Sequence, residues 1–163
     1  MIRIQLALAF AMALVQVGCS ADTRTGSSAP PNSPTNASAL KPGMKIRLKI
    51  EDKVLTAPLI DSRTTRDFVS LLPLTLKMND LFRREKFAHL PRAMSDEGKR
   101  THSYEIGQLA YWSPGPDVAI FYRNDGEKIP NPGIIVIGKV DSGVEVLDVV
   151  GSVKVAVELV DEP

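Results

Sequence analysis

The sequence predicts a mainly β protein: a small closed β-barrel with one short helix across an end, preceded by a disordered N-terminal segment. Two observations lead to this fold class. Residues 44–50 and 152–159 alternate apolar and polar side chains, the period-two pattern of a half-buried strand. Residues 107–140 hold three apolar runs separated by Pro- and Gly-rich turns. Many short strands with little helix favour a barrel or a sandwich.

The composition limits the classes of function. The chain has 163 residues, which is enough for one domain and short for two. Its 20 basic and 19 acidic residues give a net charge of +1 without a sustained basic run, so we expect no nucleic-acid partner. One cysteine and two distant histidines predict no metal site. Phosphate-binding and dinucleotide motifs are absent from the sequence, and we expect no cofactor.

The first 19 residues have the three-part pattern of a secretory signal: a positive start, an apolar centre of about 14 residues and a small residue at the end. The apolar run is shorter than the roughly 20 residues of a membrane span. Gly18 and Cys19 resemble the lipobox of bacterial lipoproteins, although Gln16 stands where that motif usually has leucine. The resemblance implies lipidation of Cys19 and a membrane anchor in the periplasm or cell envelope. The alternative is ordinary signal cleavage and secretion, with Cys19 incidental.

Residues 20–42 predict a flexible linker because they are rich in Ser, Thr, Pro and Asn and contain no aromatic residue. Such a segment cannot bury enough apolar surface to offset its conformational entropy. We interpret it as a spacer between an anchor and a domain at residues 43–163.

A hairpin and a helix are expected at the start of this domain. Residues 44–50 predict the first strand, and residues 54–60 predict its antiparallel partner. Ser62 can cap a helix at residues 64–72, which Pro73 ends. We expect the apolar face of this helix, including Phe68, to plug one mouth of the barrel together with Leu72.

The other elements follow from shorter patterns. Residues 134–137 are apolar at every position and predict a strand that is covered on both faces. Residues 79–84 predict a turn or a short helical piece, residues 91–103 predict a loop, and residues 144–147 predict a single helical turn. Further strands are expected at residues 74–78, 86–90, 108–113, 118–122 and 152–159.

Four segments in this order resemble small bacterial cyclophilin-like domain proteins. They are Thr65–Phe68 with Leu71–Leu74, Leu90–Arg92, Gly107–Trp112 through Tyr122, and the Gly-Lys-Val turn within Ile137–Val144. The resemblance covers residues 44–147 and implies a closed barrel with a helix across one end.

The resemblance also implies candidate site residues. True cyclophilins are peptidyl-prolyl isomerases that use an arginine from a Phe-x-Arg strand, a Gln-Gly-Gly segment and an aromatic-walled pocket. Neither motif is present here, and Arg92 is the nearest candidate for the arginine. Phe121 matches the pocket phenylalanine, and Trp112 is a candidate pocket wall or a core residue. Glu85 and His89 fit no catalytic spacing, so we expect solvated side chains there.

We therefore expect an exported, non-catalytic module that binds a peptide or small ligand near Arg92, Trp112 and Phe121. The alternative is a peptidyl-prolyl isomerase with an altered site. The link to isomerisation is an analogy of fold, and fold does not imply function.

Overall fold

The structure is a computed structural model that describes residues 40–160. The predicted signal sequence at residues 1–19, the lipidation site Cys19 and residues 20–39 of the predicted linker lie outside the described residues. Within the described part, no helix is both long enough and apolar enough to cross a membrane.

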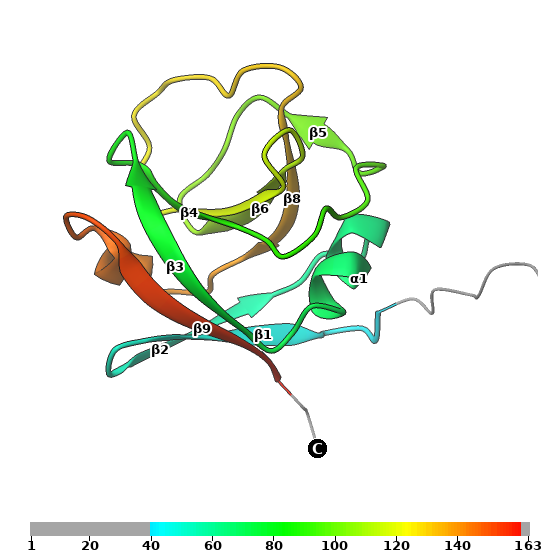
Figure 1. Cartoon of the computed structure of the whole chain (residues 1–163), viewed down its shortest axis with the longest axis horizontal. Coiled ribbons are helices and arrows are strands. Elements are labelled where there is room, and N and C mark those ends of the chain that lie inside the picture. Colours follow the sequence, from blue (N-terminus) through cyan, green and yellow to red (C-terminus); the bar gives the residue numbers. More distant parts are fainter. Residues whose placement is uncertain (1–39, 161–163) are drawn as a thin grey trace, which may run out of the picture. The chain divides into compact units, whose positions relative to one another are not determined.

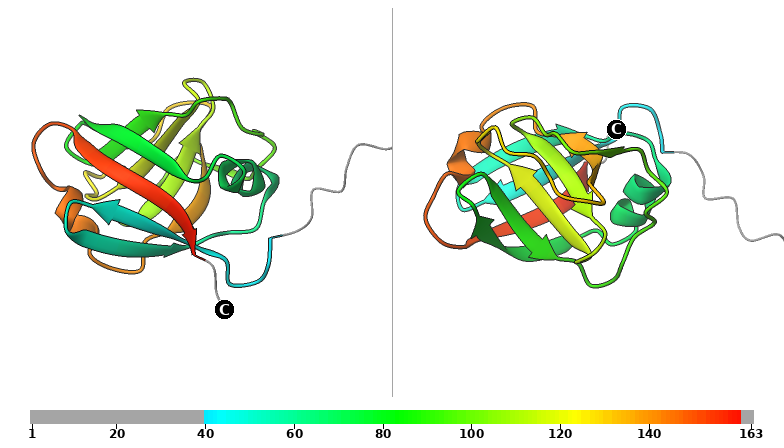
Figure 2. Two further views of the ribbon diagram at one scale, coloured as in Figure 1. Left: turned by 60° about the horizontal axis from the view of Figure 1, so that its bottom comes forward. Right: turned by 90° about the horizontal axis from the view of Figure 1, so that it is seen from above.

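Residues 40–160 form one nine-stranded antiparallel sheet in the order β2-β1-β9-β3-β4-β7-β6-β8-β5. The sheet curls strongly, so that β1, β2 and β9 lie below β4, β6 and β8 in Figure 1, and the views in Figure 2 show the same curvature. The strands are β1 Lys45–Ile50, β2 Lys53–Pro58, β3 Leu74–Leu81, β4 Glu85–His89, β5 Arg100–Thr101, β6 Gln108–Trp112, β7 Asp117–Phe121, β8 Ile134–Lys139 and β9 Val153–Val160.

The two ends of this sheet approach each other at one place. An isolated antiparallel bridge joins Leu59, just after β2, to Gly138 of β8. The amide of Ile60 donates a hydrogen bond of 2.9 Å to the carbonyl of Ile137. The sheet order itself ends at β2 and β5, so the architecture is a curled half-barrel. A fully closed barrel stays a prediction.

The elements expected from the sequence pattern are present, with two corrections. β3 runs to Leu81, through part of the turn expected at residues 79–84, because residues 79–81 pair with residues 85–87 of β4. The loop expected at residues 91–103 contains β5, which pairs with Ile134 and Ile135. The helical turn expected at residues 144–147 is confirmed as the 3₁₀ helix η1 Val144–Leu147.

Helix α1 Arg63–Val69 begins one residue before the predicted start and ends at Val69, three residues short of the predicted end at Leu72, because Ser70 caps it. The hydroxyl of Ser62 accepts a hydrogen bond of 3.1 Å from the amide of Thr65, which satisfies one of the free donors of the first turn. Phe68 is 1% exposed and belongs to the interior apolar cluster, while Leu72 packs against that cluster partly buried. The predicted contribution of α1 to the core is therefore confirmed.

The sheet is apolar on both faces over part of its area. The inner face forms the main core, whose members include Ile46, Leu48 and Ile135. A second, smaller cluster lies on the outer face of β6, β7 and β8, and it contains Phe121 and Ile134. Successive residues of a strand point to opposite faces, so Ile134 and Ile135 serve different clusters. The predicted strand with both faces covered is confirmed.

One lysine is fully buried at the end of the inner core. Lys86 of β4 is 0% exposed, and its ammonium group donates to Asp80 Oδ2 at 2.8 Å and to the carbonyls of Val149 and Gly151 at 2.6 and 2.8 Å. Burial raises the pKa of Asp80, but the hydrogen bonds from Lys86 and Tyr122 outweigh this and hold the pKa below its ordinary value. Through these hydrogen bonds Lys86 links the loop before β9 to strand β4.

Replacing Lys86 with methionine is expected to lower the free energy of unfolding by about 3–5 kcal/mol, because Asp80 and two carbonyls would lose their donor in a buried site. The measurement is urea denaturation at neutral pH. Lys77→Met, at an exposed position of β3, is the matched control and should change the stability little. Equal losses in the two variants would show that the buried ammonium group contributes nothing.

Candidate functional site

The candidate site lies on the outer face of β4 and β7. In the antiparallel register, Phe87 pairs with Ala119 and His89 pairs with Asp117. Because side chains alternate along a strand, Glu85 and Phe87 face outward while Lys86 faces the inner core. Trp112 lies opposite Asp117 on the neighbouring strand β6 and extends the same outer face.

Two connecting segments partly cover this face. Ile129, in the connection between β7 and β8, is 5% exposed and belongs to the outer cluster. The ring of Tyr104, which precedes β6, stacks on Phe121 with ring centroids 4.2 Å apart and an interplanar angle of 20°. These contacts cover one part of the outer face and leave the part over Phe87 and Ala119 open as a cleft.

The cleft has a volume of about 230 Å³, which is below the usual range of about 300–1,000 Å³ for sites that hold drug-sized ligands. Its size suits one side chain or a small molecule. Apolar side chains make up most of its walls. The lining residues are Leu81, Phe82, Arg84, Glu85, Phe87, Trp112, Asp117, Ala119, Ile129, Pro130 and Ile134.

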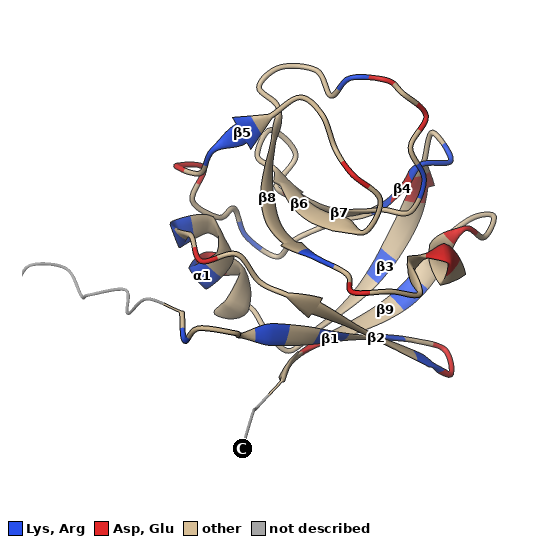
Figure 3. Ribbon diagram, turned by 180° about the vertical axis from the view of Figure 1, so that it is seen from behind, with Lys and Arg blue, Asp and Glu red and all other residues tan. Residues whose placement is uncertain are grey.

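A buried acid and a buried base meet at one end of the cleft. The side chains of Glu85 and Arg84 are only 8% and 7% exposed, and Arg84 Nε lies 3.6 Å from Glu85 Oε1. Arg84 Nη1 lies 3.4 Å from Asp125 Oδ2, and Tyr104 donates its hydroxyl proton to the same carboxylate. Figure 3 shows basic and acidic residues adjacent at the start of β4. Arg84 is therefore shared between two carboxylates.

Burial raises the pKa of Glu85 to about 7, and the neighbouring Arg84 only partly opposes this. Desolvation disfavours the charged form of a carboxyl group, which is the reason for the direction of the shift. Asp117, near Trp112, also has a pKa raised by burial, although His89 acts against the shift. Asp117 Oδ1 is in ion-pair contact with His89 Nδ1, whereas Arg84 Nε faces Glu85 Oε1 beyond hydrogen-bond distance.

The rim of the cleft carries a strained turn between β3 and β4. Phe82 and Arg83 both have a φ of +54°, a left-handed conformation that is uncommon for residues other than glycine. Phe82 is 71% exposed, and the guanidinium of Arg84 lies 5.1 Å from the centre of its ring. The backbone thus holds a large apolar side chain in solvent beside the cleft.

The structure brings together two of the three residues that the sequence singled out. Trp112 lines the cleft, and Phe121 lies in the apolar cluster beside it at 0% exposed. Arg92 is exposed and is not among the lining residues; its guanidinium donates to Ser70 Oγ, next to α1, at 2.6 Å. Whether any of the three binds a ligand stays a prediction.

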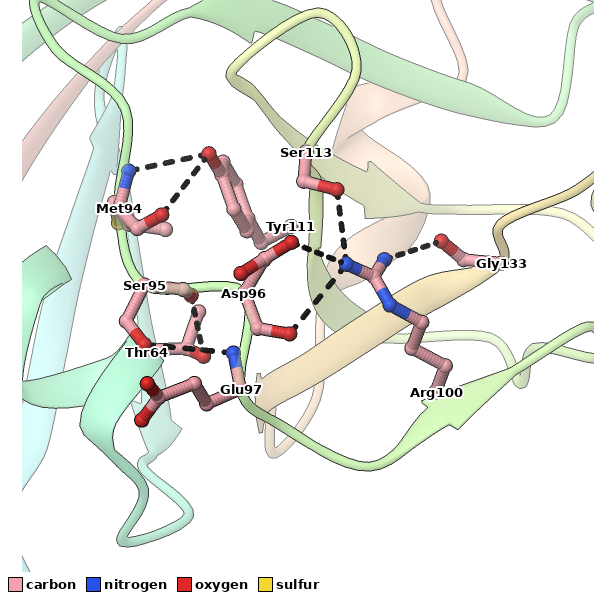
Figure 4. A network of polar contacts seen from close by, with 9 residues as sticks. All are labelled: Thr64, Met94, Ser95, Asp96, Glu97, Arg100, Tyr111, Ser113 and Gly133. Atoms are coloured by element: carbon pink, nitrogen blue, oxygen red, sulfur yellow. Dashed lines mark hydrogen bonds and ion pairs between the residues drawn. The ribbon is translucent and has the colours of Figure 1, made fainter.

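The path of the loop at residues 91–99 explains the position of Arg92. Thr64 of α1 donates to the carbonyl of Ser95 at 2.8 Å, and the amide of Met94 donates to the hydroxyl of Tyr111 at 3.1 Å (Figure 4). Arg100 donates to the carbonyl of Gly133 at 3.3 Å, next to the cleft wall at Ile134. The first two contacts fix the loop between α1 and β6.

Sequence reasoning missed the polar residues of the cleft. Glu85 was expected to be solvated, yet it is 6% exposed, because β4 begins at Glu85 and directs this side chain under the adjoining loops. The alternation of Glu85, Phe87 and His89 along one face is the signal that could have identified it. In the described residues, no group of three or more His, Cys, Asp or Glu could hold a metal ion.

The fold and site define a class: a curled antiparallel half-barrel with a small, mostly apolar cleft on its outer face. The sequence model of the Cyclophilin-like family matches residues 48–160, and the chain belongs to this family. A hypothetical protein from Archaeoglobus fulgidus has a similar solution structure, with a TM-score of 0.58 and 23% sequence identity over 71% of this chain and 94% of that chain. That likeness shows the fold alone. No significant match is found among curated proteins.

Glu85 makes the stability depend on pH. Its folded pKa of about 7 exceeds the ordinary value of 4.5, so between these values the folded protein keeps a proton that the unfolded chain releases. Stability is therefore lost as the pH rises through this window. Glu85→Gln should become more stable than the natural protein by on the order of 3 kcal/mol between pH 4.5 and 7.5.

The measurement is the free energy of unfolding of both proteins in urea across this pH range. Glu97→Gln, at an exposed position, is the control and should follow the natural protein. A constant difference between Glu85→Gln and the natural protein across the whole range would mean that Glu85 does not titrate near neutral pH.

Proposed function

We propose that this protein is an exported cyclophilin-like domain protein that binds a peptide or a small ligand in the outer-face cleft without catalysing a reaction. The observation that carries the proposal is the cleft itself: an apolar concavity between Phe87, Trp112 and Ile129 with a few buried polar groups. Ligand sites usually combine mostly apolar walls with a few polar groups that orient the ligand. The cleft has both properties.

The strained turn supports this location. Non-glycine residues with positive φ cost on the order of 1–3 kcal/mol each, and such strain concentrates at functional sites. Here it keeps Phe82 exposed at the rim of the cleft, where an apolar ring can contact a ligand. The guanidinium of Arg84 and the carboxylate of Asp117 place a donor and an acceptor in the wall of the same cleft, where they are paired with Glu85 and His89.

Peptidyl-prolyl isomerase activity is the second candidate function, and Arg84 favours it. Isomerisation needs a cation that polarises the prolyl amide beside an apolar seat for the proline ring. The guanidinium of Arg84 lines the cleft together with the apolar side chains of Phe87 and Ile129. However, Glu85 and Asp125 compete for this guanidinium, which weakens its field on a bound amide. We therefore prefer the non-catalytic function.

A blocked Ala-Ala-Pro-Phe tetrapeptide is expected to change the fluorescence of Trp112, the single tryptophan of the chain, in a saturable manner. Ala119→Leu fills the cleft and should weaken this binding at least about tenfold, a loss of roughly 1.4 kcal/mol. Ala156→Leu, on β9 away from the cleft, is the matched control. The same samples are assayed for isomerisation of the Ala-Pro bond.

For a binding module, the isomerisation rate equals the uncatalysed rate. A faster rate that Ala119→Leu abolishes would replace the first function with the second. If the two leucine variants bind the peptide equally well, the cleft is not the binding site.

We further propose that Cys19 carries the lipid anchor and that the protein resides in the periplasm or cell envelope. The apolar segment ending in Gly18 and Cys19 supports this location. A stable anchor requires more than one acyl chain, because a single chain binds a membrane only marginally. A spacer composed like residues 20–42 can hold the domain away from the membrane surface.

Expression in a bacterium that processes lipoproteins tests the anchor. The natural chain should incorporate labelled palmitate and sediment with the membranes, whereas Cys19→Ala should do neither. Ser20→Ala is the control and should keep both properties. Unlabelled natural protein in the soluble fraction would favour ordinary signal cleavage.

A further inference from the structure

The carboxylate of Glu85 is buried at one end of the cleft. Its side chain is only 8% exposed. Its nearest basic atom, Arg84 Nε, lies 3.6 Å away, beyond hydrogen-bond distance. Burial disfavours the charged form of a carboxyl group, so the ionised Glu85 carries a desolvation cost. An incoming donor would remove this cost.

The charges that face Glu85 leave an excess of negative charge. Arg84 is the cation beside it, and this guanidinium also pairs with Asp125 at 3.4 Å. The hydroxyl of Tyr104 donates a hydrogen bond to Asp125. Asp117 adds a third carboxylate, at the end of the cleft away from Glu85. Two carboxylates therefore share the guanidinium of Arg84, and the third, Asp117, is paired with the imidazole of His89. A ligand that brings positive charge complements it, whereas an anion would be repelled.

The middle of the cleft is suited to an unbranched apolar stem. Phe87 and Ala119 form a cross-strand pair between the end at Glu85 and the end at Asp117, and Ile134 adds an apolar wall. From Glu85 to the level of Phe87 is two residues along β4, roughly 7 Å at the usual rise of a strand. An aliphatic chain of a few carbons spans this distance, and the small volume admits little more than one side chain.

We propose that the cleft binds the side chain of a lysine in a peptide, with its ammonium group against the carboxylate of Glu85 and its aliphatic stem along Phe87 and Ala119. This inference rests on the proposed function, because it names the ligand class of the same cleft. Charge complementarity at Glu85 and the apolar middle of the cleft are the two independent observations that support it. The exposed ring of Phe82 at the rim offers a contact for the peptide flanking the lysine.

Binding of an ammonium group has a consequence for protonation. Burial raises the pKa of Glu85 to about 7 in the free protein. A cation beside the carboxylate favours the charged form and lowers this pKa, so binding releases a proton at pH values near and below 7. The affinity for the lysine peptide should rise between about pH 6 and pH 8 and then level off. Besides burial, the charges of Arg84, Asp125 and Asp117 contribute to the pKa of Glu85 in the free protein.

The test compares three blocked tripeptides, Ala-Xaa-Ala, in which Xaa is lysine, norleucine or glutamate. Norleucine has the stem of lysine without the ammonium group. Titration of the purified protein at pH 8, followed by Trp112 fluorescence, should show the lysine peptide binding about tenfold or more tightly than the norleucine peptide. The glutamate peptide should bind more weakly than either. Calorimetry at pH 6.5 in two buffers with different ionisation enthalpies should show proton release for the lysine peptide alone.

Glu85→Gln keeps the size of the side chain and should reduce the preference for lysine over norleucine to near one. Glu158→Gln, on β9, is the matched control and should keep the preference of the natural protein. n-Butylamine carries the same head group without a peptide, and an affinity equal to that of the lysine peptide would overturn the assignment to a peptide.

A norleucine peptide that binds as tightly as the lysine peptide would overturn the inference while leaving the cleft as an apolar binding site. Failure of all three tripeptides to bind would also overturn it, and the proposed function would then rest on the Ala119→Leu experiment. If the natural protein prefers lysine without releasing a proton and Glu85→Gln keeps that preference, the ammonium group is not held by Glu85.

Discussion

The apolar outer face of β4, β6, β7 and β8 is the constraint on which the rest of this structure depends. A strand with apolar residues on both sides must be covered twice, because each exposed apolar side chain forgoes about 1.5–3 kcal/mol of burial energy. The curl of the sheet covers the inner face. The outer face has no second sheet in the described domain, so Tyr104 and the connection around Ile129 cover it instead. Their cover is incomplete, and the uncovered part is the cleft.

Two neighbouring residues of β4 show contrasting ways of burying a charge. The ammonium group of Lys86 finds three oxygen acceptors and is fully satisfied on the inner face. The carboxylate of Glu85, on the outer face, finds only a guanidinium that Asp125 also engages. Buried polar groups normally acquire partners, so an exception calls for an explanation. The buried lysine is explained by its structural contacts, whereas a buried glutamate that shares its only cation with Asp125 is suited to a second cationic partner.

The family and the fold place few limits on what the cleft does. The Cyclophilin-like family match covers residues 48–160, and the similar solved structure shares the fold at 23% identity. Folds host many functions, and function must be argued from the site. In this chain the site combines an aromatic wall at Trp112, a strained turn at Phe82 and a buried carboxylate at Glu85. Its chemistry comes from these side chains and not from the motifs of the prolyl isomerases.

The sequence by itself determined the mainly β class, most strand positions, the capped helix at Ser62 and the double burial of residues 134–137. These features depend on local periodicity and on turn and capping residues, which a single chain segment already contains. Trp112 and Phe121 were identified as aromatic candidates, but Glu85 and Asp117 were not. The existence and lining of the cleft depend on the tertiary structure, because it places β4 beside β7 and brings residues from the loop at 123–133 over them. It also directed Arg92 toward Ser70. Pairing between distant strands sets which side chains meet, and no local pattern encodes that pairing.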